Sequence, residues 1–489
     1  MNFAAFQLEL GLVALALLLL VLDVLHKKTL DVSKGYVIGT TGLGILLILS
    51  FLIKNPVVVP DSMVQLDSMA LGFKRMFLAL GLGFFIINQN WIERRNDTFI
   101  TYQILFLLAL VGMMMACSIN NLALLFLTME MVAVPFYVLV GYLKEKESSL
   151  ESGVKYLVMA SLASAVMVMG IAFVYGVSGT LYLDKLAQFT PPAEMKSAYW
   201  LGVMLIVAGL GFKISAFPFH YWAPDVYQGA AAPVTGFLAS ASKAVGFVLL
   251  TRFAVAAMPL GTAHVTLLWV IISAASILYG NLCAIPQQNV KRLIAFSGIA
   301  NAGYMMMAFA VGDATALSAM FYYLIAYAFT IMGAFLAITL VESEVGSSDL
   351  DALAALPGRS PFAAFLLSAA MVSLAGIPPM AGFVGKFLLL KSVFVQGIAG
   401  SGALIALACV ALFGVIVSIY YYFGVVRAVY WPREYAQKQY SQGERIALPK
   451  ILWVVGALSL TMVVLPGVYP ALLLKATQWM AGALTFVAH

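Results

Sequence analysis

The sequence predicts an all-α polytopic membrane protein of about fourteen transmembrane helices, with two inverted five-helix repeats that each contain a broken helix. Hydrophobic residues fill 63% of its 489 positions and charged residues only 10%, whereas an ordinary soluble domain is about 25% charged. Apolar runs approaching the roughly 20 residues that a bilayer-spanning helix needs recur along the whole chain. Two of these runs, the seventh and the twelfth, are interrupted by prolines near a lysine.

The expected spans follow from these apolar runs, taken in order. The first run ends in Asp23 and the pair Lys27–Lys28 rather than at a small-residue cleavage site, so it is predicted as a membrane span and not as a removable signal. The predicted spans are Leu8–Leu25, Tyr36–Ile53, Leu71–Ile87, Thr101–Cys117, Leu122–Leu143, Gly153–Tyr175, Trp200–Val226, Ala232–Ala256, Val265–Ile285, Leu293–Val311, Ala316–Val341, Phe362–Val395, Ala403–Tyr430 and Leu452–Leu474.

The ordinal position of the two interrupted spans predicts the organisation of the chain. Residues 1–100 hold helices 1–3, residues 101–257 the first repeat (helices 4–8), residues 258–430 the second repeat (helices 9–13), and residues 431–489 a loop and helix 14. The interrupted helix is the fourth of each repeat. Because five is odd, the second repeat enters the bilayer upside down, and such inverted repeats place ion sites near the midplane at discontinuous helices.

Charges in the loops predict the orientation. Cations gather in the loops that follow odd-numbered spans, namely Lys27, Lys28, Lys34, Arg94, Arg95, Lys144, Lys146, Lys291, Arg292, Arg359, Arg433, Lys438, Arg445 and Lys450. By the positive-inside rule that side is cytoplasmic, which places both termini on the other side. The net charge of +6 is scattered over short loops, so it reflects topology and indicates no nucleic-acid partner.

The first break lies in the stretch GFKISAFPFHYWAPDVYQG, residues 211–229. Pro218 cannot donate the helical hydrogen bond to the carbonyl of Ile214, so the helix that carries Lys213 must break or kink within a turn of that lysine. A broken membrane helix beside a buried cation is typical of an ion pathway.

The second break repeats this pattern in LAGIPPMAGFVGKF. Pro378 and Pro379 leave the carbonyls of Leu374 and Ala375 without helical donors. A second buried lysine, Lys386, follows.

Further ionisable residues lie inside the apolar spans. Glu130 sits about midway through its span, where an ionised carboxylate costs several kcal/mol unless it is paired, hydrated or protonated. Lys155 opens the next helix, and Lys243 lies among small residues that let helices approach one another. With Lys213, four consecutive helices therefore offer one acid and three bases, which we expect to face the interior of the bundle.

Several of these residues also have a purely structural interpretation. Lys155 can extend to the membrane interface, and Lys291 beside Arg292 fits a cytoplasmic flank. His220 serves either to cap exposed backbone at the break or to transfer protons, and Asp225 fits a cap for the short helix after the break.

Other polar or sulfur-containing residues carry no predicted chemistry. The run Tyr420–Tyr422 is expected in an interface belt. The three cysteines form no CxxC pair, and the histidines do not recur on one apolar helix with haem-like spacing. We therefore expect no metal, redox centre or other cofactor in this chain.

The segments around Glu130 and Lys155, together with GFKISAFPFHYWAPDVYQGAAAPV, ASKAVGF, NVKRLIAFSGIANAGY and LAGIPPMAGFVGKF, resemble the antiporter-like, proton-translocating membrane subunits of respiratory complex I. The resemblance runs from about Asn121 to Phe387. It implies that Glu130 and Lys155 form an ion pair that modulates Lys213, the central proton-carrying residue.

Further roles follow from the same resemblance. It makes His220 a polar element at the break, and it implies that Lys243 links the Lys213 site to the second half, that Lys291 lies beside the tenth helix, and that Lys386 serves the exit side. Where the family often has histidine in the tenth helix, this chain has Asn301. An amide holds water but does not titrate near neutral pH.

The resemblance also implies an activity and a setting. The chain would move protons as a subunit of a translocating NADH:quinone oxidoreductase in the cell inner membrane, driven by electron transfer in partner subunits that hold FMN and iron–sulfur clusters. Its partners would be an adjacent antiporter-like subunit, small membrane subunits and the lipid bilayer. The alternatives are an Mrp-like cation/proton antiporter subunit, a ferredoxin- or hydrogenase-linked relative of complex I, and a non-pumping structural subunit.

Overall fold

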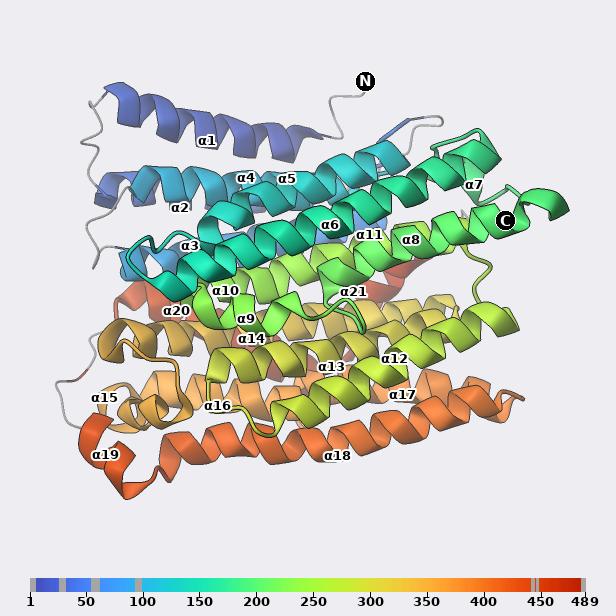
Figure 1. Ribbon diagram of the computed structural model, residues 1–489. Helices are drawn as coiled ribbons and strands as arrows, with labels where there is room; N and C mark the ends of the chain where they lie inside the picture. Colours follow the sequence, from blue (N-terminus) through green and yellow to red (C-terminus); the bar gives the residue numbers. More distant parts are fainter. Residues whose placement is uncertain are drawn as a thin grey trace.

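The computed structural model describes residues 6–25, 32–53, 62–92, 99–440, 445 and 448–484. In these ranges the chain is a bundle of long helices that lie side by side (Figure 1). Fourteen of the described helices are long and apolar enough to cross a membrane, which confirms the predicted number. Of the loop cations used for the orientation, Lys27, Lys28, Arg94 and Arg95 lie outside the described residues.

The elements follow the predicted spans closely. The first half of the chain forms α1 (Gln7–Leu25), α2 (Val32–Leu52), α3 (Ser68–Ile92), α4 (Phe99–Cys117), α5 (Leu122–Val140), α6 (Glu147–Ser178), α7 (Leu183–Leu186), η2 (Ala193–Met195), α8 (Lys196–Ile214), α9 (Trp222–Gly229), α10 (Ala232–Phe237), η3 (Leu238–Ser242) and α11 (Lys243–Ala257). The second half forms α12 (Ala263–Ala284), α13 (Val290–Val311), α14 (Ala314–Val345), η4 (Leu350–Ala355), α15 (Leu356–Arg359), α16 (Pro361–Ala375), α17 (Ala381–Ile398), α18 (Gly402–Tyr430), α19 (Glu434–Tyr440), α20 (Lys450–Val468) and α21 (Ala471–Gly482).

Two boundaries differ from the prediction in ways that matter. Helix α6 begins at Glu147, not at Gly153, because its polar first turn is stabilised by an acidic residue at the positive end of the helix dipole. Lys155 therefore lies two turns inside the helix instead of opening it. The last predicted span is divided, since α20 ends at Val468, shortly after Pro466, and α21 begins at Ala471.

Both described ends of the chain lie at the same end of the bundle. Near the start of α1, Glu9 forms an ion pair of 2.6 Å with Lys74 in the first turns of α3. Near the end of α21, the carbonyl of Trp479 accepts a hydrogen bond from Ser68, also at the start of α3. We call this end of the bundle the Gln7 end. The shared position agrees with an even number of spans, while the side of the membrane that it faces stays a prediction.

Both predicted helix breaks are confirmed. Helix α8 ends at Ile214, and Ser215 takes the left-handed conformation with φ of 57°. Helix α16 ends at Ala375, where Gly376 takes the same conformation with φ of 82°. A left-handed residue stops an α-helix, and the prolines that follow prevent it from resuming directly. The inverted relation between the two repeats stays a prediction.

The eighth span contains an irregularity that the sequence did not reveal. Between α10 and α11, residues Leu238–Ser242 form a π-helical turn, and Lys243 is the first residue after it. Such turns are rare and occur often at functional sites.

Three spans form the centre of the bundle. An 18-residue stretch of each of the segments Ala232–Ala257, Val290–Val311 and Ala314–Val345 is buried completely inside the protein. Lysines on these segments are therefore shielded from lipid by the surrounding helices.

Candidate functional site

Lys213 lies at the end of α8, immediately before the first break, with only 4% of its surface exposed. Its Nζ has no hydrogen-bond partner among the described residues. The side chain packs against α11 at Gly246, where an added Cβ would lie 3.1 Å from Lys213 Cγ. The first break therefore leaves a buried lysine that packs against α11, the helix that also carries Lys243.

The expected ion pair between Glu130 and Lys155 is wrong in this structure. The Glu130 carboxylate accepts a hydrogen bond from Ser164. Lys155 lies nine residues before Ser164 on α6, which is about 13 Å along the helix. It pairs instead with Glu151 at 2.7 Å and with Asp225 at 3.0 Å, and its side chain is 42% exposed. Sequence reasoning placed Lys155 correctly on α6 but could not give its depth relative to Glu130.

Asp225 lies in the first turn of α9, but its side chain does not cap that helix as expected. Its two carboxylate oxygens accept hydrogen bonds from Lys155 and from Arg292, the latter at 2.6 Å. Asp225 thus ties α6 to the start of α13 across the broken segment.

His220 is buried in the break, and neither of its ring nitrogens has a hydrogen-bond partner among the described residues. Its ring lies 5.4 Å from that of Phe217 and 4.2 Å from that of Tyr279, measured between centroids. The structure therefore does not support a backbone cap. An unpaired buried imidazole leaves the proton-transfer interpretation open to test.

Lys243 follows the π-helical turn and reaches from α11 to α13. Its Nζ donates a hydrogen bond of 2.9 Å to the carbonyl of Gly298. A Cβ added at Gly298 would lie 2.8 Å from this Nζ and 3.3 Å from the hydroxyl of Tyr327. Lys243 is three residues before Gly246, the residue that contacts Lys213, so both positions share one face of α11. One helix face thereby joins the first two lysines.

Asn301 lies at the centre of a buried cluster of polar side chains. Its Nδ2 donates to the hydroxyl of Tyr422 at 3.3 Å, and its Oδ1 accepts from the hydroxyl of Tyr323 at 2.7 Å. The cluster corrects the predicted interface belt. Tyr420 is 71% exposed, but Tyr421 and Tyr422 are only 3% and 1% exposed and face the protein interior.

Lys386 lies after the second break and reaches back to it. Its Nζ donates a hydrogen bond of 2.6 Å to the carbonyl of Leu374, one of the two carbonyls that the proline pair deprives of helical donors. The same Nζ lies 4.9 Å from the ring centre of Tyr304 on α13, within cation–π range. The break therefore supplies the acceptor that holds this buried cation.

One face of α13 connects the sites of Lys243, Asn301 and Lys386. On this face, the carbonyl of Gly298 accepts the hydrogen bond from Lys243, and Asn301 is hydrogen-bonded to the tyrosine hydroxyls. The ring of Tyr304 lies next to the Lys386 ammonium group. The three positions are spaced by three residues, so they follow one another on the same side of the helix over about 9 Å. We define the buried polar line as Lys213, Lys243, Asn301 and Lys386.

Lys291 belongs to a separate, paired site at the start of α13. Its Nζ lies 3.0 Å from Oε2 of Glu342 and donates a hydrogen bond of 2.8 Å to the carbonyl of Ala230. The two side chains are 3% and 7% exposed, so Lys291 is not the solvated flank that the adjoining Arg292 suggested. Sequence reasoning missed Glu342 because it follows the predicted end of its span at Val341. A buried cation with no assigned partner was the signal that an acid had to be nearby.

A polar cleft of about 430 Å³ opens at this site, at the end of the bundle opposite the Gln7 end. Lys155, Asp225, Lys291 and Glu342 all line it, together with loop residues such as Asp349. The described residues contain no group of three or more His, Cys, Asp or Glu side chains that could hold a metal ion.

Together the fold and the site define a class: a multi-pass helical membrane protein whose broken helices carry buried, sparsely bonded lysines. Residues 119–414 match the family described as NADH:quinone oxidoreductase/Mrp antiporter, TM. The chain belongs to this family. It is 36% identical over 423 residues to NADH-quinone oxidoreductase subunit N of Moorella thermoacetica, an alignment that covers 86% of each chain.

Solved structures of similar chains agree with this assignment. A chain of respiratory complex I from Thermus thermophilus with bound aureothin is 27% identical, with a TM-score of 0.79 over 96% of this chain and 99% of that one. A chain of the Mrp complex from Dietzia sp. has a TM-score of 0.84 over 100% of both chains but only 20% identity, so it supports the fold alone.

Proposed function

We propose that this chain is subunit N of a proton-translocating NADH:quinone oxidoreductase and that it moves protons through its buried lysines and water. Electron transfer from NADH to quinone in other subunits drives the movement. The buried polar line carries this proposal, because it joins both broken helices through the centre of the bundle.

The lysines of this line suit a proton carrier because the protein solvates them sparsely. Burial disfavours the charged form of a lysine, and a nearby carboxylate favours it. Lys213 has no hydrogen-bond partner among the described residues, while Lys243 and Lys386 each donate to one backbone carbonyl. A shift of Glu130 toward or away from Lys213 would therefore decide whether that lysine holds or releases its proton.

The polar cleft supplies the inlet in this proposal. It opens at the end of the bundle that the loop cations predict to be cytoplasmic, and the Lys291–Glu342 pair lines it. Lys155, Glu151 and Asp225 at its rim are partly exposed to water. His220 is a further polar element at the first break.

In this proposal, protons that move from the first half of the chain to the second pass Asn301. An amide donates and accepts hydrogen bonds but cannot take up a proton near neutral pH, so the step from Lys243 to Lys386 depends on water and on the hydroxyls of Tyr323 and Tyr422. Each charge moved across the membrane costs about 2.3 kcal/mol per 100 mV. A series of stations divides that work into smaller steps.

The setting follows from the same proposal. The chain lies in the cell inner membrane with both termini on the non-cytoplasmic side, beside another antiporter-like subunit and small membrane subunits. FMN and iron–sulfur clusters belong to partner polypeptides, and this chain holds no redox centre. It takes part in the enzyme as the translocating subunit.

A second candidate is an Mrp-like cation/proton antiporter subunit, which the fold of the Dietzia Mrp chain favours. A ferredoxin- or hydrogenase-linked relative of complex I would use the same membrane chain with another electron donor. Purification of the tagged chain from its native membrane separates these functions. Copurifying flavin and iron–sulfur polypeptides with NADH:quinone activity support the proposal, and their absence contradicts it.

Proton movement is tested by two substitutions of Lys213 in the assembled complex. Lys213→Met removes the proton-carrying group, and Lys213→Arg keeps a positive charge that does not leave near neutral pH. We expect both variants to lower NADH-driven acidification of inside-out vesicles while the complex remains assembled. A non-pumping structural role predicts instead that arginine restores full acidification.

A further inference from the structure

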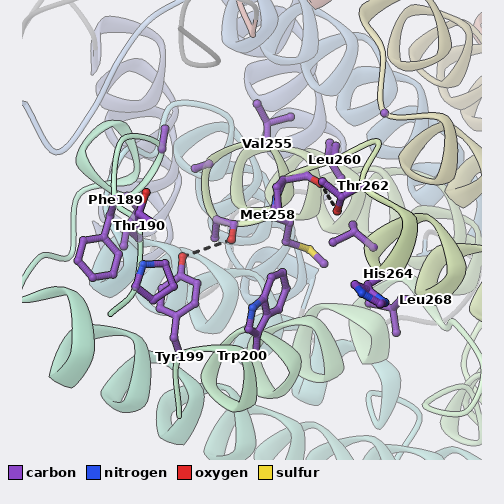
Figure 2. Close-up of a pocket in the computed structure, with 18 of the residues that line it drawn as sticks. Phe189, Thr190, Tyr199, Trp200, Val255, Met258, Leu260, Thr262, His264 and Leu268 are labelled. Carbon is purple, nitrogen blue, oxygen red and sulfur yellow. Dashed lines mark hydrogen bonds between the residues drawn. The ribbon is translucent and has the colours of Figure 1, made fainter. Parts of the chain in front are cut away.

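A second and larger cleft, of about 1090 Å³, opens at the Gln7 end of the bundle. It lies between the start of α8, the end of α11 and the start of α12, and the end of α21 closes one side. Figure 2 shows Tyr199 and Trp200 of α8 facing Met258 and Leu268 across it. No residue of the buried polar line or of the Lys291–Glu342 pair lines this cleft.

The wall of the cleft is mainly apolar. Trp200, Met258 and Leu268 contribute large apolar side chains. The hydroxyl of Tyr199 donates a hydrogen bond of 3.2 Å to the carbonyl of Ala257, as the dashed line in Figure 2 shows. An apolar cleft at the upper end of the usual volume for small-molecule sites fits a ligand with long hydrocarbon chains.

The described lining of the cleft contains one formally charged side chain, the cation Lys196, and one imidazole, that of His264. Lys196, the first residue of α8, and His264, the second residue of α12, both line it and are exposed. No acidic side chain belongs to the described lining. The hydroxyl of Thr262 donates to the carbonyl of Pro259 instead of capping α12, so the first N–H groups of α12 have no side-chain acceptor and favour an anion there.

The position of Lys196 near the start of α8 suits contact with a lipid headgroup. Tyr and Trp side chains concentrate at the membrane–water interface, and Tyr199 and Trp200 lie within one turn of Lys196 on α8. The cation is thus near the interface, while the apolar wall continues toward the membrane interior.

We propose that this cleft binds an anionic phospholipid, whose phosphate lies between Lys196 and His264 and whose acyl chains lie along Trp200, Met258 and Leu268. The lipid fills the space between the two predicted repeats at the Gln7 end. This inference uses the membrane location of the chain and does not depend on which residues carry protons.

The proposal is tested first on the purified complex by counting the phosphatidylglycerol that remains bound after detergent washing. The double variant Lys196→Gln/His264→Gln is expected to retain several-fold less of it at this site. Lys185→Gln is the control, because Lys185 is an exposed lysine at the same end that does not line the cleft. Equal retention by the double variant and the control would overturn the proposal.

A photoactivatable phosphatidylglycerol with a diazirine on its acyl chain gives the second test. Peptides that contain Trp200, Met258 or Leu268 should be labelled more strongly than the exposed residues Leu412 and Ile416 of α18. Equal labelling by a phosphatidylcholine probe contradicts the charge recognition. If labelling appears only in a chain that ends at Leu484, the protein's own last residues occupy the cleft and the proposal is wrong.

Discussion

Glu342 is the residue whose neutralisation tests the inlet of the proposed pathway most sharply. Glu342→Gln keeps the size of the side chain and one hydrogen-bond acceptor, but it removes the negative charge that lies 3.0 Å from Lys291 Nζ. Lys291 keeps its hydrogen bond to the carbonyl of Ala230. The substitution therefore isolates the electrostatic part of the pair.

The geometry sets the size of the effect. Two unit charges 3.0 Å apart interact by about 1.4 kcal/mol in water and by about 5.5 kcal/mol at an effective dielectric constant of about 20. The side chains are only 3% and 7% exposed, so the higher value is the better guide. The lower value alone corresponds to about a factor of ten in rate, so we expect Glu342→Gln to lower proton uptake by at least that factor.

The assay is NADH-driven quenching of a pH-sensitive dye in inside-out vesicles, normalised to the amount of assembled complex. Glu344→Gln is the matched control on the same helix. Glu344 pairs with Arg359 at 2.8 Å, and it does not line the polar cleft. Wild-type proton uptake by an assembled Glu342→Gln complex would refute the role given to this pair.

Two further substitutions test the buried polar line. Gly298→Ala places a Cβ 2.8 Å from Lys243 Nζ, so it should displace the ammonium group and lower proton uptake. Gly424→Ala is the control, because there is open space around Gly424 and its substitution should leave uptake unchanged. Equal uptake by the two variants would contradict the contact between Lys243 and Gly298. Asn301→Leu leaves the hydroxyl of Tyr323 without its amide acceptor, at about 1–3 kcal/mol for a buried group left unsatisfied. We expect the leucine variant to lose proton uptake and Asn301→His to retain it, and full uptake by the leucine variant would remove Asn301 from the pathway.

Much of the fold was predictable because membrane spans are long and must satisfy their own backbone. Both breaks were visible from Pro218 and from the pair Pro378–Pro379, since proline removes a helical donor wherever it stands. The π-helical turn before Lys243 was not predictable. Its residues are leucine, alanine and serine, and their local preferences do not distinguish one helical register from another.

The sequence predicted which ionisable residues are buried, but it did not predict which residues they pair with. The cost of burying charge singled out Glu130, Lys213 and Lys386 without any coordinates. The partners depend on the depth and rotation of each helix, which an apolar run does not record. For this reason the sequence could not test the Glu130–Lys155 pair that the resemblance implies, and it did not reveal the partners Asp225 and Glu342.

In the proposed function, buried lysines of this chain carry the protons. The most direct measurement is the number of protons moved per NADH oxidised by the purified complex in sealed liposomes, with Lys243→Met compared with the unsubstituted protein. Lys243 is the station that joins the two halves of the line. We expect fewer protons per NADH in the variant, and an unchanged ratio in an assembled, electron-transferring complex would show that Lys243 carries none of them.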